Sequence, residues 1–189
     1  MKILNLYAGI GGNRWLWKDV EVTAVEINEE IAGIYKSHFP QDEVIVGDAH
    51  QYLLEHYKEF DFIWSSPPCP THSRLCYSKS VKQYPSMVLW QEIIFLKTWF
   101  KGKWVVENVL PYYEPLIEPR VLIGRHCFWS NFKIPKIPFT NIDVSRATQE
   151  ELSNELNIPS PMIKSRLLLR NCVHPKMGLH LFKSIPKDL

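Results

Sequence analysis

The stretch KILNLYAGIGG (residues 2–12) begins the chain with a short apolar strand that runs directly into a glycine-rich turn. Glycine lacks a Cβ atom, so such a turn lets the backbone approach a ligand closely. Residues 13–17 have a composition that can open a helix. A strand, a glycine-rich turn and a helix start predict a nucleotide-type cofactor cradle, and a tight turn that needs positive φ is the alternative.

Two further strand–helix units follow this turn. Residues 22–28 and 44–48 have the composition of strands, and the helical spacing of apolar residues over 29–39 and 50–60 follows them. Regular alternation of strands and helices predicts an α/β fold with a doubly wound, mostly parallel, Rossmann-like sheet.

An acidic residue ends each of these two strands, Glu26 in the first and Asp48 in the second. In nucleotide-binding sheets a carboxylate at such a strand end binds ribose hydroxyls, which predicts that role for Glu26. Asp48 is a candidate acceptor for an adenine amino group. Helix capping is the alternative role for Asp48, and capping or a solvated position is the alternative for Glu26.

The stretch DFIWSSPPCPTHS (residues 61–73) predicts a fourth strand that stops at two prolines and presents one cysteine. Proline has a fixed φ and no amide hydrogen, so no regular element continues through Pro67 and Pro68. Ligands bind at the carboxyl ends of strands in open α/β sheets, which makes the Cys69 thiol a candidate nucleophile. A buried, inert cysteine is the alternative.

A polar and basic segment, residues 74–85, follows Cys69 and is expected to be a surface loop that contacts substrate or merely connects elements. An apolar helix over residues 87–99 is assigned to the core. KWVVENV (residues 103–109) predicts a fifth strand, and Glu107 near its end is the acid best placed to partner Cys69.

The alternation fades beyond residue 111. An aromatic run over 127–132 predicts a strand, and helices are expected over 149–156, 162–169 and 176–185. The net charge is +2, but residues 1–119 carry −4 and residues 120–189 carry +6. A basic C-terminal part favours a polyanionic partner such as nucleic acid, with a solvated surface as the alternative.

The composition is that of one soluble domain of 189 residues. No apolar run approaches the roughly 20 residues of a membrane span, and the N-terminus lacks the layout of a signal peptide. The four cysteines have no metal-like spacing with histidine. We therefore expect reduced thiols in a cytoplasmic protein, with no metal and no membrane.

Taken in order, six short motifs resemble the DNA (cytosine-5) methyltransferase family. They are NLYAGIGG (5–12), VEIN (25–28), GD (47–48), SPPC (66–69), ENV (107–109) and NCVHP (171–175).

The resemblance implies transfer of a methyl group from S-adenosylmethionine to carbon 5 of a cytosine flipped out of DNA. Cys69 would add to C6 and Glu107 would act as the general acid at N3. Some local stabilisation of the Cys69 thiolate is expected. The implied cofactor-binding residues are Tyr7, Ala8, Gly9, Ile10, Gly11, Gly12, Glu26, Ile27, Asp48, Ala49, Pro67, Asn171 and Val173. The implied contacts to nucleic acid are Ser73, Arg74, Arg120 and Arg125.

The sequence departs from the family pattern at several positions. Asn5 and Asn28 stand where the family usually has aspartate, and Arg170 stands where it usually has glycine. Residues 70–72, Pro-Thr-His, replace a Gln-x-Phe segment. A Gln-x-Arg-x-Arg motif is not recognisable, so Arg120 or Arg125 is expected to serve in its place.

Three segments are predicted. Residues 1–132 form the catalytic and cofactor-binding core, 133–169 a reduced target-recognition region, and 170–189 a C-terminal motif and helix that pack back on the core. Because the middle segment is short, a partner chain could supply target recognition. The sequence does not indicate the oligomeric state. A bacterial or phage restriction–modification context is expected.

Three alternatives remain at this point. One is the same carbon methylation on RNA of the tRNA type, which shares the motifs. Another is a catalytically weak nucleic-acid-binding protein that depends on a partner chain. The third is methylation of an exocyclic amino group, which Ser66-Pro67-Pro68 would fit but Cys69 and residues 107–109 oppose.

Overall fold

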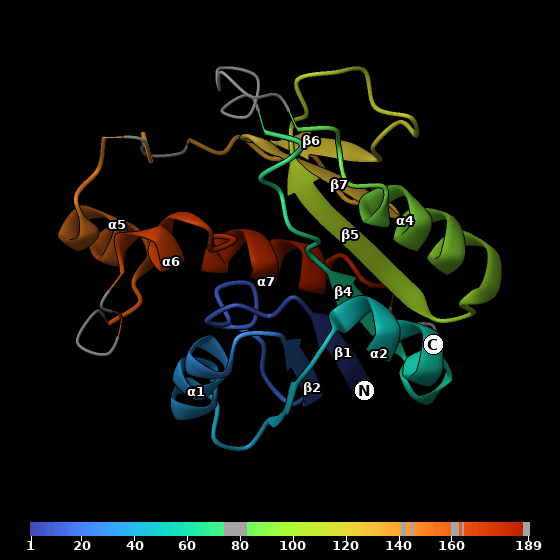
Figure 1. Cartoon of the computed structure of the whole chain (residues 1–189), viewed down its shortest axis with the longest axis horizontal. Helices are drawn as coiled ribbons and strands as arrows, with labels where there is room; N and C mark the ends of the chain where they lie inside the picture. Colours follow the sequence, from blue (N-terminus) through green and yellow to red (C-terminus); the bar gives the residue numbers. More distant parts are fainter. Residues whose placement is uncertain (74–82, 141–142, 145, 160–162, 164, 187–189) are drawn as a thin grey trace.

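One seven-stranded sheet organises the chain (Figure 1). The computed structural model describes residues 1–73, 83–140, 143–144, 146–159, 163 and 165–186. The strands lie in the order β3-β2-β1-β4-β5-β7-β6. Their bounds are β1 (Lys2–Leu6), β2 (Glu21–Glu26), β3 (Glu43–Val46), β4 (Phe62–Ser65), β5 (Lys103–Val109), β6 (Val121–Ile123) and β7 (His126–Ser130).

The first five strands pair in parallel, and β7 pairs antiparallel with both β5 and β6. The expected doubly wound, mostly parallel sheet is thereby confirmed. Strand β6 was not predicted, because three residues are too few to show a strand period.

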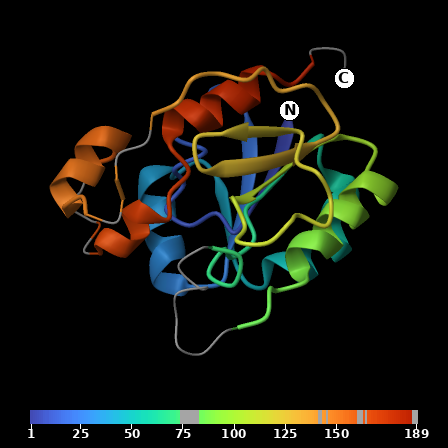
Figure 2. The ribbon, with the colours of Figure 1, turned by 90° about the horizontal axis from the view of Figure 1, so that it is seen from above.

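Helices cover both faces of the sheet (Figure 2). Helices α2 and α4 pack on one face through a core that includes Leu53, Leu89 and Ile93. Helices α1 and α7 cover the other face, where Tyr35 and Met177 are fully buried. The helix bounds are α1 (Glu29–His38), α2 (Ala49–His56), α4 (Val88–Trp99), α5 (Gln149–Leu156), α6 (Arg166–Arg170) and α7 (Pro175–Lys183), with a 3₁₀ turn η1 (Tyr57–Glu59) after α2.

The expected helix over residues 13–17 does not form. Backbone hydrogen bonds there join residues three apart, from Arg14 N to Gly11 O and from Trp17 N to Arg14 O, which gives successive turns. Both side chains are also held by other segments, because Arg14 pairs with Asp42 and Trp17 Nε1 donates to Gly178 O of α7 at 3.1 Å. The C-terminal helix α7 therefore packs directly against this turn.

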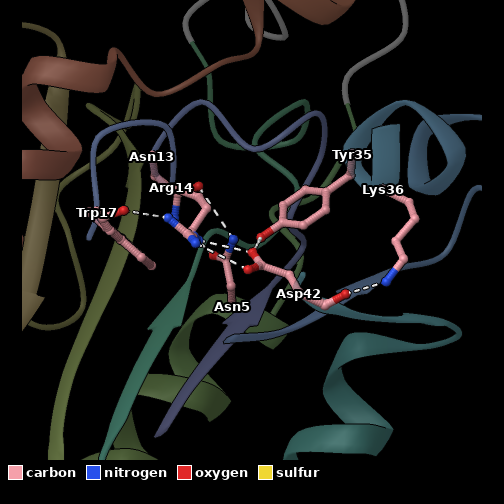
Figure 3. Close-up of polar contacts among 7 residues, drawn as sticks. All are labelled: Asn5, Asn13, Arg14, Trp17, Tyr35, Lys36 and Asp42. Atoms are coloured by element: carbon pink, nitrogen blue, oxygen red, sulfur yellow. Dashed lines mark hydrogen bonds and ion pairs between the residues drawn. The ribbon is translucent and has the colours of Figure 1, made fainter. Parts of the chain in front are cut away.

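A buried polar cluster holds the residues that flank the glycine-rich turn (Figure 3). The Arg14 guanidinium donates to both carboxylate oxygens of Asp42, at 2.9 and 3.1 Å, and to the Trp17 carbonyl at 2.7 Å. Asn13 Nδ2 donates to Asn5 Oδ1 at 2.8 Å, so Asn5 makes an uncharged pair where the family usually has an acid. The ends of the glycine-rich segment are thus anchored by paired groups, as buried charges require.

Within the part of the chain that the structure describes, no helix combines the length and apolar character needed to cross a membrane.

Candidate active site

A cavity of about 760 Å³ lies at the carboxyl end of the parallel strands. Most of the predicted site residues line it, although they come from segments spread over more than 160 positions of the chain. They are Tyr7, Ala8, Gly9, Ile10, Gly12, Glu26, Ile27, Asp48, Ala49, Pro67, Cys69, Ser73, Glu107, Arg125, Asn171 and Val173. Its volume is typical of pockets that enclose a small organic molecule.

One end of the cavity is formed by the glycine-rich turn and two acids. Gly9 has a φ of +54°, and a Cβ added there would meet no atom within 4 Å, so a ligand can lie directly against this backbone. Glu26 accepts hydrogen bonds from the amides of Gly9 and Asn28, both at 3.0 Å. Asp48 caps α2 by accepting from Gln51 N at 2.8 Å, as the alternative role predicted, yet it also lines the cavity. These two hydrogen-bond acceptors have the chemistry that the ribose hydroxyls and the adenine amino group of S-adenosylmethionine require.

The C-terminal segment closes this end of the cavity from the other side. A Cβ on Gly12 would lie 2.6 Å from the Val173 carbonyl oxygen, which shows how closely residues 171–173 fold back on the turn. Gly11 (φ +85°) faces away from the cavity, and a Cβ there would lie 2.3 Å from the Phe39 ring. Gly11 therefore serves packing, whereas its neighbours Gly9 and Gly12 face the cavity.

Cys69 lies half-buried on a short turn beyond β4. Its carbonyl oxygen accepts hydrogen bonds from the amides of His72 and Ser73, at 3.0 and 3.1 Å. Burial and the nearby Glu107 carboxylate raise the pKa of the Cys69 thiol above its usual value, and the Arg125 and Arg170 guanidiniums oppose this only in part. The two guanidiniums supply some of the local stabilisation of the thiolate that the sequence led us to expect, but desolvation and Glu107 outweigh them.

Glu107 is buried in β5 and faces the same cavity as Cys69. Its nearest polar partner is His126 of β7, whose Nδ1 lies 2.6 Å from Glu107 Oε1. The sequence did not single out His126, because the contact arises from the antiparallel pairing of β5 with β7, which has no local signal.

Two further residues hold the cysteine turn and were also missed as site residues. Asn108 Nδ2 donates to the Pro67 carbonyl at 2.8 Å. His72 is fully buried, and its Nδ1 lies 2.6 Å from the Tyr113 hydroxyl. Asn108 could have been predicted as a site residue, because it belongs to the Glu-Asn-Val motif. His72 could not, because it stands where the family pattern has a different residue.

The residues predicted to contact nucleic acid do not all lie at the cavity. Arg125 lines the cavity and donates to the Arg170 carbonyl at 3.0 Å. Arg120 is exposed beside β6, where its Nε donates to the Phe132 carbonyl at 3.3 Å, and it does not line the cavity. Arg74 lies outside the described residues. Of the two candidates for the missing arginine motif, only Arg125 faces Cys69 and Glu107.

A buried carboxylate joins Tyr7, at the start of the glycine-rich turn, to the strand before Cys69. Glu92 of α4 is fully buried and accepts hydrogen bonds from Tyr7 Oη at 2.6 Å and Ser65 Oγ at 2.5 Å. His50 Nδ1 lies 3.1 Å from the same carboxylate, whose hydrogen bond raises the pKa of that imidazole. Tyr7, which has a φ of +55°, is thus held in a rarely populated conformation by a satisfied partner.

Residues 1–111 match a protein-family model described as C-5 cytosine-specific DNA methylase. A curated tRNA (cytosine(38)-C(5))-methyltransferase of Spodoptera frugiperda is 36% identical over 80 residues, which cover 39% of this chain and 24% of that protein. The human protein of the same name is 28% identical over 82 residues, which cover 40% of this chain and 21% of that protein. The chain thus spans less than a quarter of the length of these curated relatives.

Two solved structures are similar over part of the chain. A mutant of Spodoptera frugiperda DNMT2 is 31% identical with a TM-score of 0.43, and the match covers 57% of this chain and 35% of that one. A hypothetical protein of Thermus thermphillus is 18% identical with a TM-score of 0.47, and the match covers 68% of this chain and 73% of that one.

Proposed function

The chain belongs to the family of C-5 cytosine-specific DNA methylases, and from that membership we propose that it methylates carbon 5 of cytosine in a nucleic acid. S-adenosylmethionine is the methyl donor of this family and supplies an electrophilic methyl group when bound. Gly9, Glu26 and Asp48 form the end of the cavity that fits it. The assignment of individual contacts to these residues is part of the proposal.

The single observation that carries the proposal is that Cys69 and Glu107 line the same cavity as the cofactor end. Carbon 5 of cytosine is a poor nucleophile. Addition of the Cys69 thiolate to C6 makes an enamine that reacts at C5, and a proton given to N3 by Glu107 neutralises the charge that develops. A base then takes the C5 proton, the electron pair of that C–H bond re-forms the C5–C6 double bond, and Cys69 leaves as the thiolate.

The base must reach Cys69 outside a stacked duplex, so it is flipped out or already single-stranded. We propose DNA as the substrate, with Ser73 and Arg125 at the cavity contacting the nucleotide. Transfer RNA is the second candidate, because both curated relatives described above are named as tRNA cytosine methyltransferases. A partner chain that supplies target recognition is also part of the proposal, because the segment 133–169, expected to contact the target, is short.

The proposal is tested with DNA and transfer RNA that contain 5-fluorocytosine, each incubated with the protein and labelled S-adenosylmethionine. A base cannot remove the C5 fluorine in the way that it removes the C5 proton, so elimination is blocked. A carbon-5 enzyme therefore stays attached to its target through Cys69. The expected result is a covalent adduct with one of the two nucleic acids, seen as a band that resists denaturation and that Cys69→Ser abolishes.

An adduct with transfer RNA and none with DNA would replace the first substrate by the second. An adduct that survives in Cys69→Ser, or none with either nucleic acid, would overturn the mechanism. Tyr84→Ala is a matched control, because this exposed side chain lies outside the cavity lining.

A further inference from the structure

A histidine lies against the acid that the proposed mechanism depends on. His126 Nδ1 is 2.6 Å from Glu107 Oε1, and the two residues are only 5% and 6% exposed. In the antiparallel pairing of β5 with β7, Glu107 lies opposite Phe128 and Val109 lies opposite His126. His126 and Glu107 are therefore diagonal neighbours on one face of the sheet, held by the two strands.

The proposed role of Glu107 requires a proton that an ordinary carboxyl group does not keep. Glutamate in water loses its proton near pH 4.3, about two units below histidine. A carboxyl group that must give a proton to N3 at neutral pH therefore needs a source from which it is reloaded. Imidazole is the side chain whose ordinary titration lies closest to neutrality.

Resting on the function proposed above, we propose that His126 is a positioning and proton-reloading partner of Glu107. As the bond between Cys69 Sγ and C6 forms, the carboxyl group of Glu107 gives its proton to N3 and takes the Nδ1 proton of the His126 imidazolium. When the Sγ–C6 bond breaks, N3 returns its proton to Glu107 and the Nδ1 proton returns to His126. The pair ends the cycle with the protons with which it began.

Other ionisable groups surround this pair and set its charge balance. Arg125 interacts electrostatically with Glu107 and with Cys69, and burial lowers the pKa of its guanidinium while these two groups oppose that change. The ionisable residues around the pair are Cys69, Arg125, Cys127, Glu155, Arg170, Cys172 and His174. Among the described residues, His126 is the titratable group that a hydrogen bond links directly to Glu107.

His126→Asn separates this role from a purely structural one. An asparagine side chain keeps a donor close to the place of Nδ1 and carries no titratable proton. A structural contact would survive this change, whereas a proton source would not. His56→Asn is the matched control, because His56 Nδ1 also lies near a glutamate, at 2.8 Å from Glu59 Oε1, on the exposed side of α2.

The first measurement is the single-turnover rate of adduct formation on the 5-fluorocytosine substrate from about pH 5.5 to about pH 9. His126→Asn is expected to slow the reaction about tenfold to a hundredfold at neutral pH, and its alkaline decline is expected to begin at lower pH than in the unchanged protein. In a Glu107→Gln background the same substitution is expected to add no further loss. A rate within about twofold of the unchanged protein, or an equal loss in both backgrounds, would overturn the role.

The second measurement needs neither cofactor nor nucleic acid. The imidazole of His126, labelled with ¹⁵N and assigned by its loss in His126→Asn, is titrated by NMR in the unchanged protein and in Glu107→Gln. A shifted midpoint supports the pair, and an unchanged midpoint overturns it. If the unchanged protein forms no adduct on any nucleic acid, the proposed function fails and the catalytic role fails with it, while the titration still decides whether the two residues share a proton.

Discussion

Asn108 Nδ2 donates a hydrogen bond to the Pro67 carbonyl oxygen at 2.8 Å and so ties β5 to the turn that presents Cys69. The same side chain accepts from the amide of Val109 at 3.0 Å, so its donor and acceptor ends are both used. Asn108 is 1% exposed, which makes each of these groups costly to leave unpaired. The residue next to the proposed acid therefore holds the proposed nucleophile.

Asn108→Ala is expected to lower the free energy of unfolding by about 1–3 kcal/mol and to reduce adduct formation by Cys69. The Pro67 carbonyl then lacks its side-chain donor, and the turn gains freedom. Urea denaturation and the 5-fluorocytosine assay measure the two effects. Asn131→Ala is the control, because Asn131 Nδ2 also donates to a backbone carbonyl, that of Gly102 at 2.8 Å, but on the surface. An equal cost for both variants, or full adduct formation by Asn108→Ala, would contradict the assigned role.

The raised pKa of Cys69 predicts that its reactivity toward alkylating reagents keeps increasing at pH values where a free thiol is already fully reactive. Only the thiolate is alkylated, and burial together with Glu107 disfavours it, so the midpoint for iodoacetamide labelling should lie above about 8.5. Mass spectrometry of the peptide that contains Cys69 follows the reaction. Arg125→Ala should raise the labelling midpoint further, because the Arg125 guanidinium lowers the pKa of the Cys69 thiol. Arg146→Ala is the control and should leave the midpoint unchanged, because the Arg146 side chain is 90% exposed. A midpoint at or below that of a cysteine peptide would contradict this electrostatic picture.

The strands other than β6, and most helices, were predictable because their signals are local. Strand β5 and helix α5 have the bounds expected from the sequence, since an apolar run and a capped helical period mark their ends. Glu26, Asp48, Cys69 and Glu107 could be placed near one another for a related reason: parallel strands in one sheet bring their carboxyl ends to one edge.

The features that sequence reasoning missed depend on contacts between distant segments. His126 meets Glu107 through strand register, and Glu92 meets Tyr7 across 85 positions. Residues 13–17 have acceptable helical character, yet Arg14 is pinned by Asp42 from the loop before β3. The tertiary ion pair overrides the local helical preference of residues 13–17, and no sequence pattern within that segment predicts the ion pair.

The buried ion pair between Arg14 and Asp42 predicts a large cost when one partner is removed. The side chains are 4% and 1% exposed, so Asp42→Asn leaves a buried guanidinium without its counter-ion. The free energy of unfolding, measured with urea, should fall by about 3–5 kcal/mol. Lys2→Met removes an exposed pair with Glu21 at 3.8 Å and should cost less than about 1 kcal/mol. Similar costs for the two variants would show that the Arg14 cluster does not anchor the turn.

The close approach of α7 to the glycine-rich turn predicts that Gly178→Ala weakens cofactor binding. A Cβ at Gly178 would lie 2.2 Å from the Asn13 carbonyl oxygen and 2.7 Å from its Cα, and backbone atoms cannot move aside without moving the turn. The free energy of unfolding should fall by about 1–3 kcal/mol. Because Asn13 lines the cavity at its proposed cofactor-binding end, the affinity for S-adenosylhomocysteine, measured by calorimetry, should fall about tenfold. Gly33→Ala in α1 is the matched control, since a Cβ there meets no atom within 4 Å and alanine should stabilise the helix by about 0.8–1 kcal/mol. Unchanged affinity in Gly178→Ala would mean that the position of the turn does not depend on α7.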